Sequence, residues 1–322
     1  MTYRVGSLNS TPAKDLVDRL SADLVLNGWV VVENDYVEGT YTWDVLRSPA
    51  ANNSAGNEFF IAIGYLTTGQ TTMAWTAMKE WNTTTKRATR FLPNTAILVP
   101  DALGYNPQGA VALPSTGTQI AFRTITLATG DSYYYSVTND RIIASANSVG
   151  NTTIKFLWYM GLFDSILPLS LDPLPFVFTG SFAGNPNQSV ADNNVQGFAL
   201  TEPGQTAGNT HNFATGAVYL GTSSHNSAFT IPSFANFQTG SLNLYTNQRF
   251  VNRTVVSGRS SASNNRFDWM RGLLKDLYNI SGGTFLTGDI VEWVWGGVTY
   301  SAVVLPHSGA TSADQKPILL RV

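Results

Sequence analysis

The chain has 322 residues, of which 43% are apolar, so it is long enough for about two domains of roughly 150 residues and cannot be disordered throughout. Only 12% of the residues are charged, about half the usual share of roughly 25%. The net charge is −2, with one small basic group (Lys86, Arg87 and Arg90), which argues against a dedicated nucleic-acid binder, and the lack of cysteine excludes disulfide scaffolds and thiolate metal sites.

The N-terminal segment predicts a helix. Thr11-Pro12 supplies a capping residue followed by proline at the first helical position, and Asn27-Gly28 is a typical helix stop. Apolar side chains share one face between these limits: Leu16, Val17, Leu20 and Leu24. The first residues contain no apolar stretch of the kind found in a secretory signal, and no apolar run approaches the ~20 residues of a membrane span, so neither is expected.

The segments after the helix are mostly typical of strands. Val30–Val32 predicts a strand that turns at Asn34-Asp35, and Thr40–Leu46 and Glu58–Leu66 are rich in aromatic and β-branched residues. Periodicity cannot separate strand from helix over Thr72–Trp81.

The middle of the chain predicts a β-hairpin and further strands. Tyr133–Val137 and Arg141–Ala146 flank a short turn, and Ile154–Leu162 is expected to pair with them. Prolines break the pattern between 164 and 175, before a short strand at Phe176–Phe178. The segment 180–215 is rich in Asn, Gly and Gln and is expected to be a long surface loop or a linker.

The C-terminal part contains the clearest hairpin signal. Gly296-Gly297 separates Ile290–Trp295 from Val298–Leu305, and two glycines suit the positive φ angles of a tight turn. The last residues, Pro317–Val322, are expected to pair with this hairpin. The spacing of the apolar residues in Phe267–Tyr278 favours a short helix.

These elements together predict a mainly β fold with minor α content (α+β), built from antiparallel sheets and hairpins with long loops. We expect two β-rich domains. The N-terminal domain would comprise residues 1–178 with the helix, and the C-terminal domain residues 179–322 with the loop or linker at about 180–215.

The sequence contains no recognisable catalytic, cofactor or metal motif. There is no nucleophile elbow, phosphate-binding loop or dinucleotide fingerprint, and the three histidines, His211, His225 and His307, lack metal-ligand spacing. Two carboxylate pairs are candidates for glycoside hydrolysis. Asp289 and Glu292 would point to opposite faces of a strand, whereas Asp131 and Asp140 flank the first hairpin and could lie near each other. We therefore expect a protein that is not an enzyme and needs no cofactor.

Several segments resemble structural proteins of tailed-bacteriophage virions. The first block is YYYSVTNDRII (Tyr133–Ile143), followed by WYMGLFD (Trp158–Asp164) and a proline-rich stretch, LDPLPFVFTG, that ends at Gly180. The C-terminal block begins with RGLLKDLY (Arg271–Tyr278), and WDVLRSP (Trp43–Pro49) fits the N-terminal part. Three shorter matches complete the C-terminal block: Gly288-Asp289-Ile290, Gly297-x-x-Tyr300 and Leu319–Val322.

The resemblance implies a virion component of the tail, baseplate or tail tip, assembled in the host bacterial cytoplasm. Its expected partners are copies of itself and other virion proteins. The alternatives are a receptor- or carbohydrate-binding virion protein, whose partner would be a host surface glycan, and a tail-associated glycan hydrolase. Spaced apolar residues in a polar segment can dock as separate anchors on neighbouring subunits. The candidate interface residues on this ground are Phe182, Val190, Val195, Phe198, Leu200 and Phe213.

Overall fold

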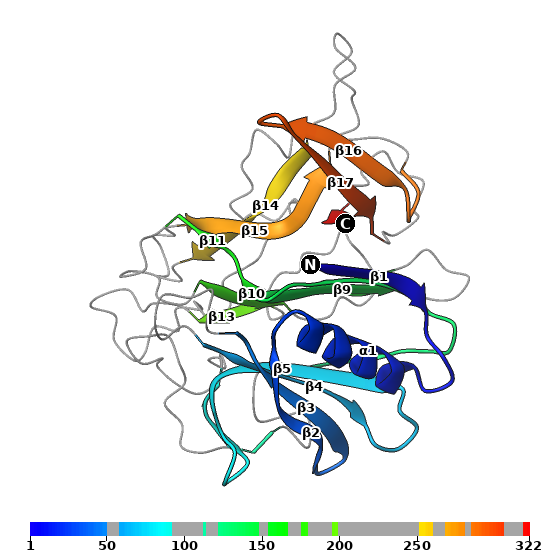
Figure 1. Cartoon of the computed structure of the whole chain (residues 1–322), viewed down its shortest axis with the longest axis vertical. Coiled ribbons are helices and arrows are strands. Elements are labelled where there is room, and N and C mark those ends of the chain that lie inside the picture. Colours follow the sequence, from blue (N-terminus) through cyan, green and yellow to red (C-terminus); the bar gives the residue numbers. More distant parts are fainter. Residues whose placement is uncertain are drawn as a thin grey trace.

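The computed structural model describes residues 1–49, 58–91, 112–113, 122–147, 154–166, 175–179, 195–198, 251–259, 268–280, 285–305 and 318–322. Over these residues the protein is mainly β, with one helix and antiparallel sheets (Figure 1), which confirms the predicted fold class. The division into two domains stays a prediction. No helix among the described residues combines the length and the apolar character needed to cross a membrane.

The described strands form three sheets. The central sheet contains, in spatial order, β1 (Thr2–Ser7), β8 (Ser132–Val137), β9 (Arg141–Asn147), β10 (Ile154–Leu162), β12 (Phe176–Thr179) and β13 (Val195–Phe198). The helix-side sheet contains β2 (Val30–Glu38), β3 (Tyr41–Arg47), β4 (Phe60–Leu66), β5 (Thr72–Asn82) and β6 (Arg87–Phe91), with β7 (Phe122–Thr126) also paired to β5. The C-terminal sheet contains β11 (Asp164–Ser165), β15 (Asp268–Ile280), β18 (Ile318–Arg321), β17 (Val298–Val304) and β16 (Ile290–Trp295), with β14 (Val251–Arg259) also paired to β15.

Helix α1 (Pro12–Leu26) forms where the sequence predicts it and lies between the helix-side and central sheets (Figure 1). Pro12 begins the helix, and Gly28 follows its end with a φ of +88° that glycine adopts without a steric penalty. Leu16, Leu20 and Leu24 are fully buried in the core between the two sheets. Burial of this apolar stripe, rather than intrinsic helix propensity, therefore fixes the helix in place.

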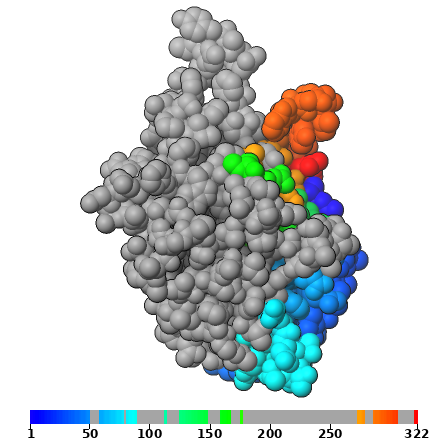
Figure 2. Space-filling view, turned by 90° about the vertical axis from the view of Figure 1, so that its left-hand side faces the viewer, coloured from blue at the N-terminus to red at the C-terminus, as the bar shows by residue number. Residues whose placement is uncertain are grey.

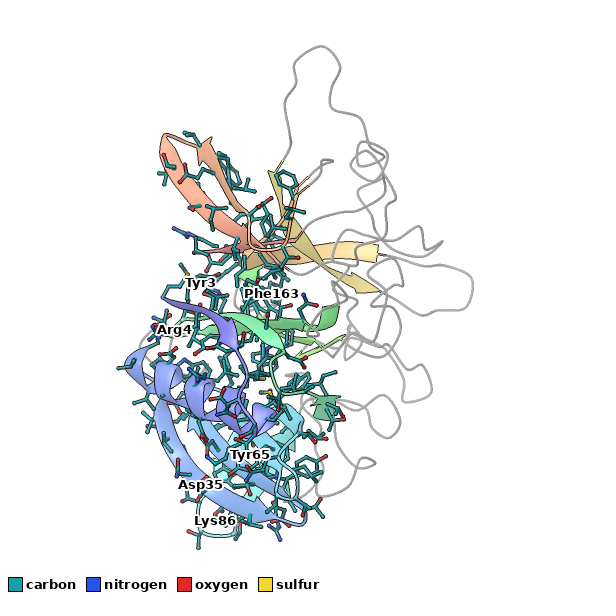
Figure 3. The ribbon with its side chains drawn as sticks, turned by 90° about the vertical axis from the view of Figure 1, so that its right-hand side faces the viewer. Tyr3, Arg4, Asp35, Tyr65, Lys86 and Phe163 are labelled. Atoms are coloured by element: carbon teal, nitrogen blue, oxygen red, sulfur yellow. The ribbon has the colours of Figure 1, made fainter. Side chains whose placement is uncertain are left out.

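The central sheet is a middle layer that is buried on both faces. Ile142 and Trp158 belong to the core beside α1, whereas the adjacent Ile143 and Tyr159 belong to a second core shared with the C-terminal sheet. Successive side chains of a strand point to opposite faces, so one pair of strands contributes to both cores. Figure 3 shows Phe163, a member of the second core, between the central and C-terminal sheets.

The predicted hairpins and pairings of the middle and C-terminal segments are confirmed. Strands β8 and β9 pair, and β10 adds to β9 and β12 to β10. Strands β16 and β17 form the predicted hairpin, and β18 pairs with β17. The ambiguous segment over Thr72–Trp81 is strand β5, which pairs with β4, β6 and β7.

The predicted turn at Asn34-Asp35 is wrong, because strand β2 continues through it as a bulge. Asp35 adopts a φ of +52°, and its backbone N–H donates to the Asp44 carboxylate at 3.0 Å. The strand reverses instead after Glu38, with Gly39 at a φ of +60°. A buried aspartate on the facing strand thus holds the residues that would otherwise form a turn.

The predicted helix at Phe267–Tyr278 is also wrong, because the segment forms strand β15. Its pairing with β14 shifts register between Arg253 and Val255, and Asp276 has a positive φ of 55°. Such a bulge changes which face the following residues point to. Leu274 and Leu277 are consequently both fully buried although they are three residues apart, which is a helix-like spacing.

The turn between β16 and β17 gives a direct test of local structure. Gly296 and Gly297 have φ angles of +59° and +78°, and nothing lies within 4 Å of a Cβ added at either position. Replacing either glycine with valine should lower the free energy of unfolding by about 1–3 kcal/mol, through backbone strain alone. Urea denaturation of both variants measures this, and an unchanged midpoint for both would contradict the turn.

Candidate functional site

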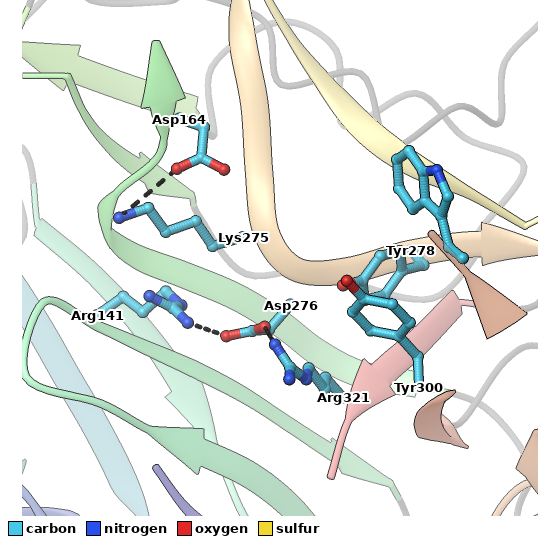
Figure 4. A pocket seen from close by; sticks show the side chains of 8 residues that line it. Arg141, Asp164, Lys275, Asp276, Tyr278, Tyr300 and Arg321 are labelled. Atoms are coloured by element: carbon cyan, nitrogen blue, oxygen red, sulfur yellow. Dashed lines mark hydrogen bonds and ion pairs between the residues drawn. The ribbon is translucent and has the colours of Figure 1, made fainter. Parts of the chain in front are cut away.

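A charged pocket of about 280 Å³ lies where the β8–β9 turn meets the C-terminal sheet (Figure 4). Its walls come from β9 of the central sheet and from strands of the C-terminal sheet. They carry three basic, two acidic and three aromatic side chains. The lining residues are Arg141, Asp164, Lys275, Asp276, Tyr278, Trp295, Tyr300 and Arg321.

Ion pairs link the charged side chains of the pocket into one network. The Arg141 guanidinium donates to the carboxylates of both Asp140 and Asp276. Lys275 Nζ lies 2.7 Å from Asp140 Oδ2 and 3.7 Å from Asp164 Oδ1, and Arg321 lies 3.3 Å from Asp276. Three cations thus face three carboxylates. Because Asp140, Arg141 and Asp276 are buried, this balance is needed to keep charge in the interior.

The backbone around the network is unusually close-packed. Gly161 has a φ of +148°, and a Cβ added there would lie 2.3 Å from the Asp140 carbonyl oxygen. At Gly272 an added Cβ would lie 2.1 Å from the Asp164 carbonyl oxygen. Two glycines therefore allow β10 and β15 to pass next to the residues that carry the charges.

The electrostatics of the pocket favour ionised carboxylates. Burial by itself would raise the pKa of Asp140, but the adjacent Arg141 and Lys275 cations and a hydrogen bond from Thr138 outweigh burial and leave this pKa below its ordinary value. Burial raises the pKa of Tyr159, whose hydroxyl donates to the Leu162 carbonyl oxygen at 2.5 Å. Asp140 therefore acts as a fixed hydrogen-bond acceptor, and Tyr159 as a neutral phenol.

Aromatic side chains form the other wall of the pocket. Tyr278 and Tyr300 line the pocket, and both contact Trp293, which packs edge-on against Tyr278 at 4.9 Å between ring centroids and stacks on Tyr300 at 5.6 Å. The Arg321 guanidinium lies 5.2 Å from the Tyr300 ring centroid, a cation–π distance. Trp295 lines the same pocket, yet 59% of its surface is exposed.

The β16–β17 hairpin carries a second notable feature, an exposed apolar surface on the opposite face from Trp295. Ile290 and Val294 are 56% and 69% exposed, and alternation along β16 places both on one side with Glu292 between them. Strand β16 is also the last strand of its sheet. Figure 2 shows the hairpin, in orange, standing out from the upper part of the described surface.

The structure does not bring Asp131 and Asp140 together as a carboxylate pair. Asp131 and Asp140 lie at opposite ends of strand β8, about 20 Å apart by strand length. The Asp131 carboxylate accepts from the Ala128 N–H at 2.7 Å, and that of Asp289 accepts from the Leu286 N–H at 2.8 Å. Both acids thus stabilise turns.

The basic group, the histidines and the candidate interface residues lie away from the charged pocket or outside the described residues. In the basic group, Lys86 contacts Glu33 at 2.5 Å and Arg87 contacts Glu38 at 3.3 Å. His211, His225 and His307 lie outside the described residues, and no group of three potential His, Asp or Glu metal ligands occurs within the described ones. Of the candidate interface residues, Val195 and Phe198 form the ends of strand β13, which pairs with β12. The remaining four lie outside the described residues: Phe182, Val190, Leu200 and Phe213.

Sequence reasoning missed the charged pocket because its parts are far apart in the chain. Arg141 and Asp276 are 135 positions apart, and neither has a distinctive local pattern. One signal was present: three of the quoted segments, Tyr133–Ile143, Trp158–Asp164 and Arg271–Tyr278, contain Asp140, Arg141, Asp164, Lys275 and Asp276. These segments meet at one place in the fold.

Comparison with known proteins gives no assignment. No protein-family model matches the chain, and no curated protein matches it.

Proposed function

We propose that the chain is a non-enzymatic structural subunit of a tailed-phage particle. It assembles in the bacterial host through contacts with copies of itself and with other virion proteins in the tail, baseplate or tail tip. Two β-rich domains, divided near residue 179, would make up the subunit. The proposal rests on the β16–β17 hairpin, whose exposed apolar side chains lie on a strand at the edge of a sheet.

An exposed apolar edge strand favours association for two reasons. Its outer backbone groups can pair with a strand of another chain, and its side chains gain free energy when they leave water. Strand β16 contains no proline and only Glu292 as a charged residue, so it has little to prevent such pairing. The low charged fraction of the chain, 12%, also limits the cost of desolvating surfaces that end up against other subunits.

Three of the quoted segments, Tyr133–Ile143, Trp158–Asp164 and Arg271–Tyr278, meet at one place in the fold, which supports the family part of the proposal. These segments come from three parts of the sequence, yet they supply both the glycines and the charges of the junction between the central and C-terminal sheets. Since the three segments build one structural junction, a protein that uses this junction needs all three of them.

The assembly role predicts a specific loss of incorporation. The double variant Ile290→Asp and Val294→Asp should reduce the amount of chain that co-sediments with phage particles at least about tenfold, because two buried charges would oppose the interface. The measurement is quantitative immunoblotting of gradient-purified particles from cells that supply the variant.

The matched control is Val37→Asp, which places a charge at an equally exposed valine on another edge strand, β2. This variant should be incorporated normally, and all variants should keep the melting temperature of the wild-type subunit. Normal incorporation of the double variant would contradict the assignment of the hairpin to assembly.

A further inference from the structure

We propose that the charged pocket is a binding site for a neutral saccharide and takes about one sugar ring of a glycan. The inference does not depend on the particle-subunit role, since it rests on the pocket and on the face of the hairpin opposite to Ile290 and Val294.

The polar groups of the pocket suit hydroxyl groups better than ions. Arg141, Lys275 and Arg321 supply hydrogen-bond donors, and Asp164 and Asp276 supply acceptors. A hydroxyl group both donates and accepts, so a polyol can use both kinds of group at once. The three basic groups and three carboxylates of the network balance, so the pocket has no net charge to hold a polyanion or a cation.

One buried donor of the pocket has no hydrogen-bond partner within the described part of the chain. The Nε–H of Arg141 is buried and unpaired, although the other two nitrogens of the same guanidinium donate to Asp140 and Asp276. An unmade hydrogen bond at a buried charged group is costly, so the network keeps one unsatisfied donor beside the pocket.

The polar groups are already held in place before any ligand arrives. Arg141, Lys275 and Asp276 are each fixed by at least one ion pair to another member of the network. Binding therefore need not order these long side chains, which is a main entropic cost of recognition by arginine and lysine.

The aromatic wall supplies the apolar surface that a sugar ring needs. The C–H groups of a pyranose form an apolar patch that packs on a flat aromatic ring, and Tyr278, Tyr300 and Trp295 all line the pocket. Trp295 is 59% exposed, and a purely structural ion network gives no reason for a large aromatic side chain at its rim. A volume of about 280 Å³ is below the ~300–1,000 Å³ of sites for drug-sized ligands, which limits the occupant to a small unit.

The test is a titration of the full chain with glucose, galactose, N-acetylglucosamine and lactose, and with glucuronate and inorganic phosphate as anionic probes. Tryptophan fluorescence and saturation-transfer NMR report binding. We expect saturable binding of at least one neutral sugar with a dissociation constant on the order of 1 mM. Trp295→Ala should weaken this binding at least about tenfold, and Tyr300→Phe, which keeps the ring, by less.

The control is Val294→Ala, which changes the adjacent exposed residue on the opposite face of the hairpin and should leave binding unchanged. Three results would overturn the proposal: no saturable binding of any neutral sugar, binding of glucuronate or phosphate alone, or equal affinities for Trp295→Ala and the control. Neither Trp295 nor Tyr300 belongs to the Ile290–Val294 face, so Trp295→Ala and Tyr300→Phe should be incorporated into particles normally. Particle incorporation therefore tests the assembly role separately from saccharide binding.

Discussion

Replacing Gly161 with alanine is expected to destabilise the protein by about 3–5 kcal/mol. Two penalties combine at this position. The φ of +148° is unfavourable for any residue with a Cβ, and the added carbon would lie 2.3 Å from the Asp140 carbonyl oxygen and 2.4 Å from the Arg141 Cα. Backbone atoms cannot move aside as a flexible side chain can, so either β10 or the β8–β9 turn must shift.

The control for Gly161→Ala is Gly69→Ala. Gly69 also has a positive φ, +75°, but nothing lies within 4 Å of an added Cβ, so its replacement should cost only about 1 kcal/mol. Chemical denaturation of both variants measures the difference. Similar losses at the two positions would show that the close contact between β10 and the turn does not contribute.

Asp276→Asn should also cause a large loss, about 3–5 kcal/mol, because it removes the negative charge that balances a buried guanidinium. Asp276 is 6% exposed and accepts from Arg141, which is 9% exposed, and from Arg321. Asparagine keeps the shape of the side chain, so the loss reports the missing charge and not a cavity.

The matched control is Asp18→Asn on the surface of α1. Asp18 pairs with Lys14 at 2.6 Å in an i,i+4 arrangement, but both side chains are substantially exposed. Its loss should be no more than about 0.5 kcal/mol. Equal unfolding free energies for Asp276→Asn and the control would mean that the buried network does not stabilise the junction of the two sheets.

The elements with strong local signals could be predicted from the sequence. Thr11-Pro12 and Asn27-Gly28 delimit helix α1, and Gly296-Gly297 marks the turn between β16 and β17, because caps and turns depend on neighbouring residues. The two errors fall at bulges, Asn34-Asp35 and Asp276, where a positive φ changes the alternation of a strand. Tertiary partners hold both bulges: Asp44 accepts from the Asp35 N–H, and Arg141 and Arg321 pair with Asp276.

The charged pocket could not be predicted, because it arises only when the central and C-terminal sheets meet. Its residues come from β9, β11, β15, β16, β17 and β18, and no local pattern connects them. The glycines do give a partial signal. Gly161 and Gly272 occur within aromatic or charged segments where a glycine otherwise weakens a strand, and such glycines mark a close approach of backbones.

We propose above all that the chain is an integral subunit of a tailed-phage particle, and the composition of purified particles tests this proposal most directly. Particles purified by density gradient from cells that carry the gene should be washed at high salt and analysed by quantitative mass spectrometry. The account predicts that the chain is present in a constant ratio to the main structural proteins of the particle, from preparation to preparation. Absence of the chain from washed particles, or an amount that falls with each wash, would contradict the account.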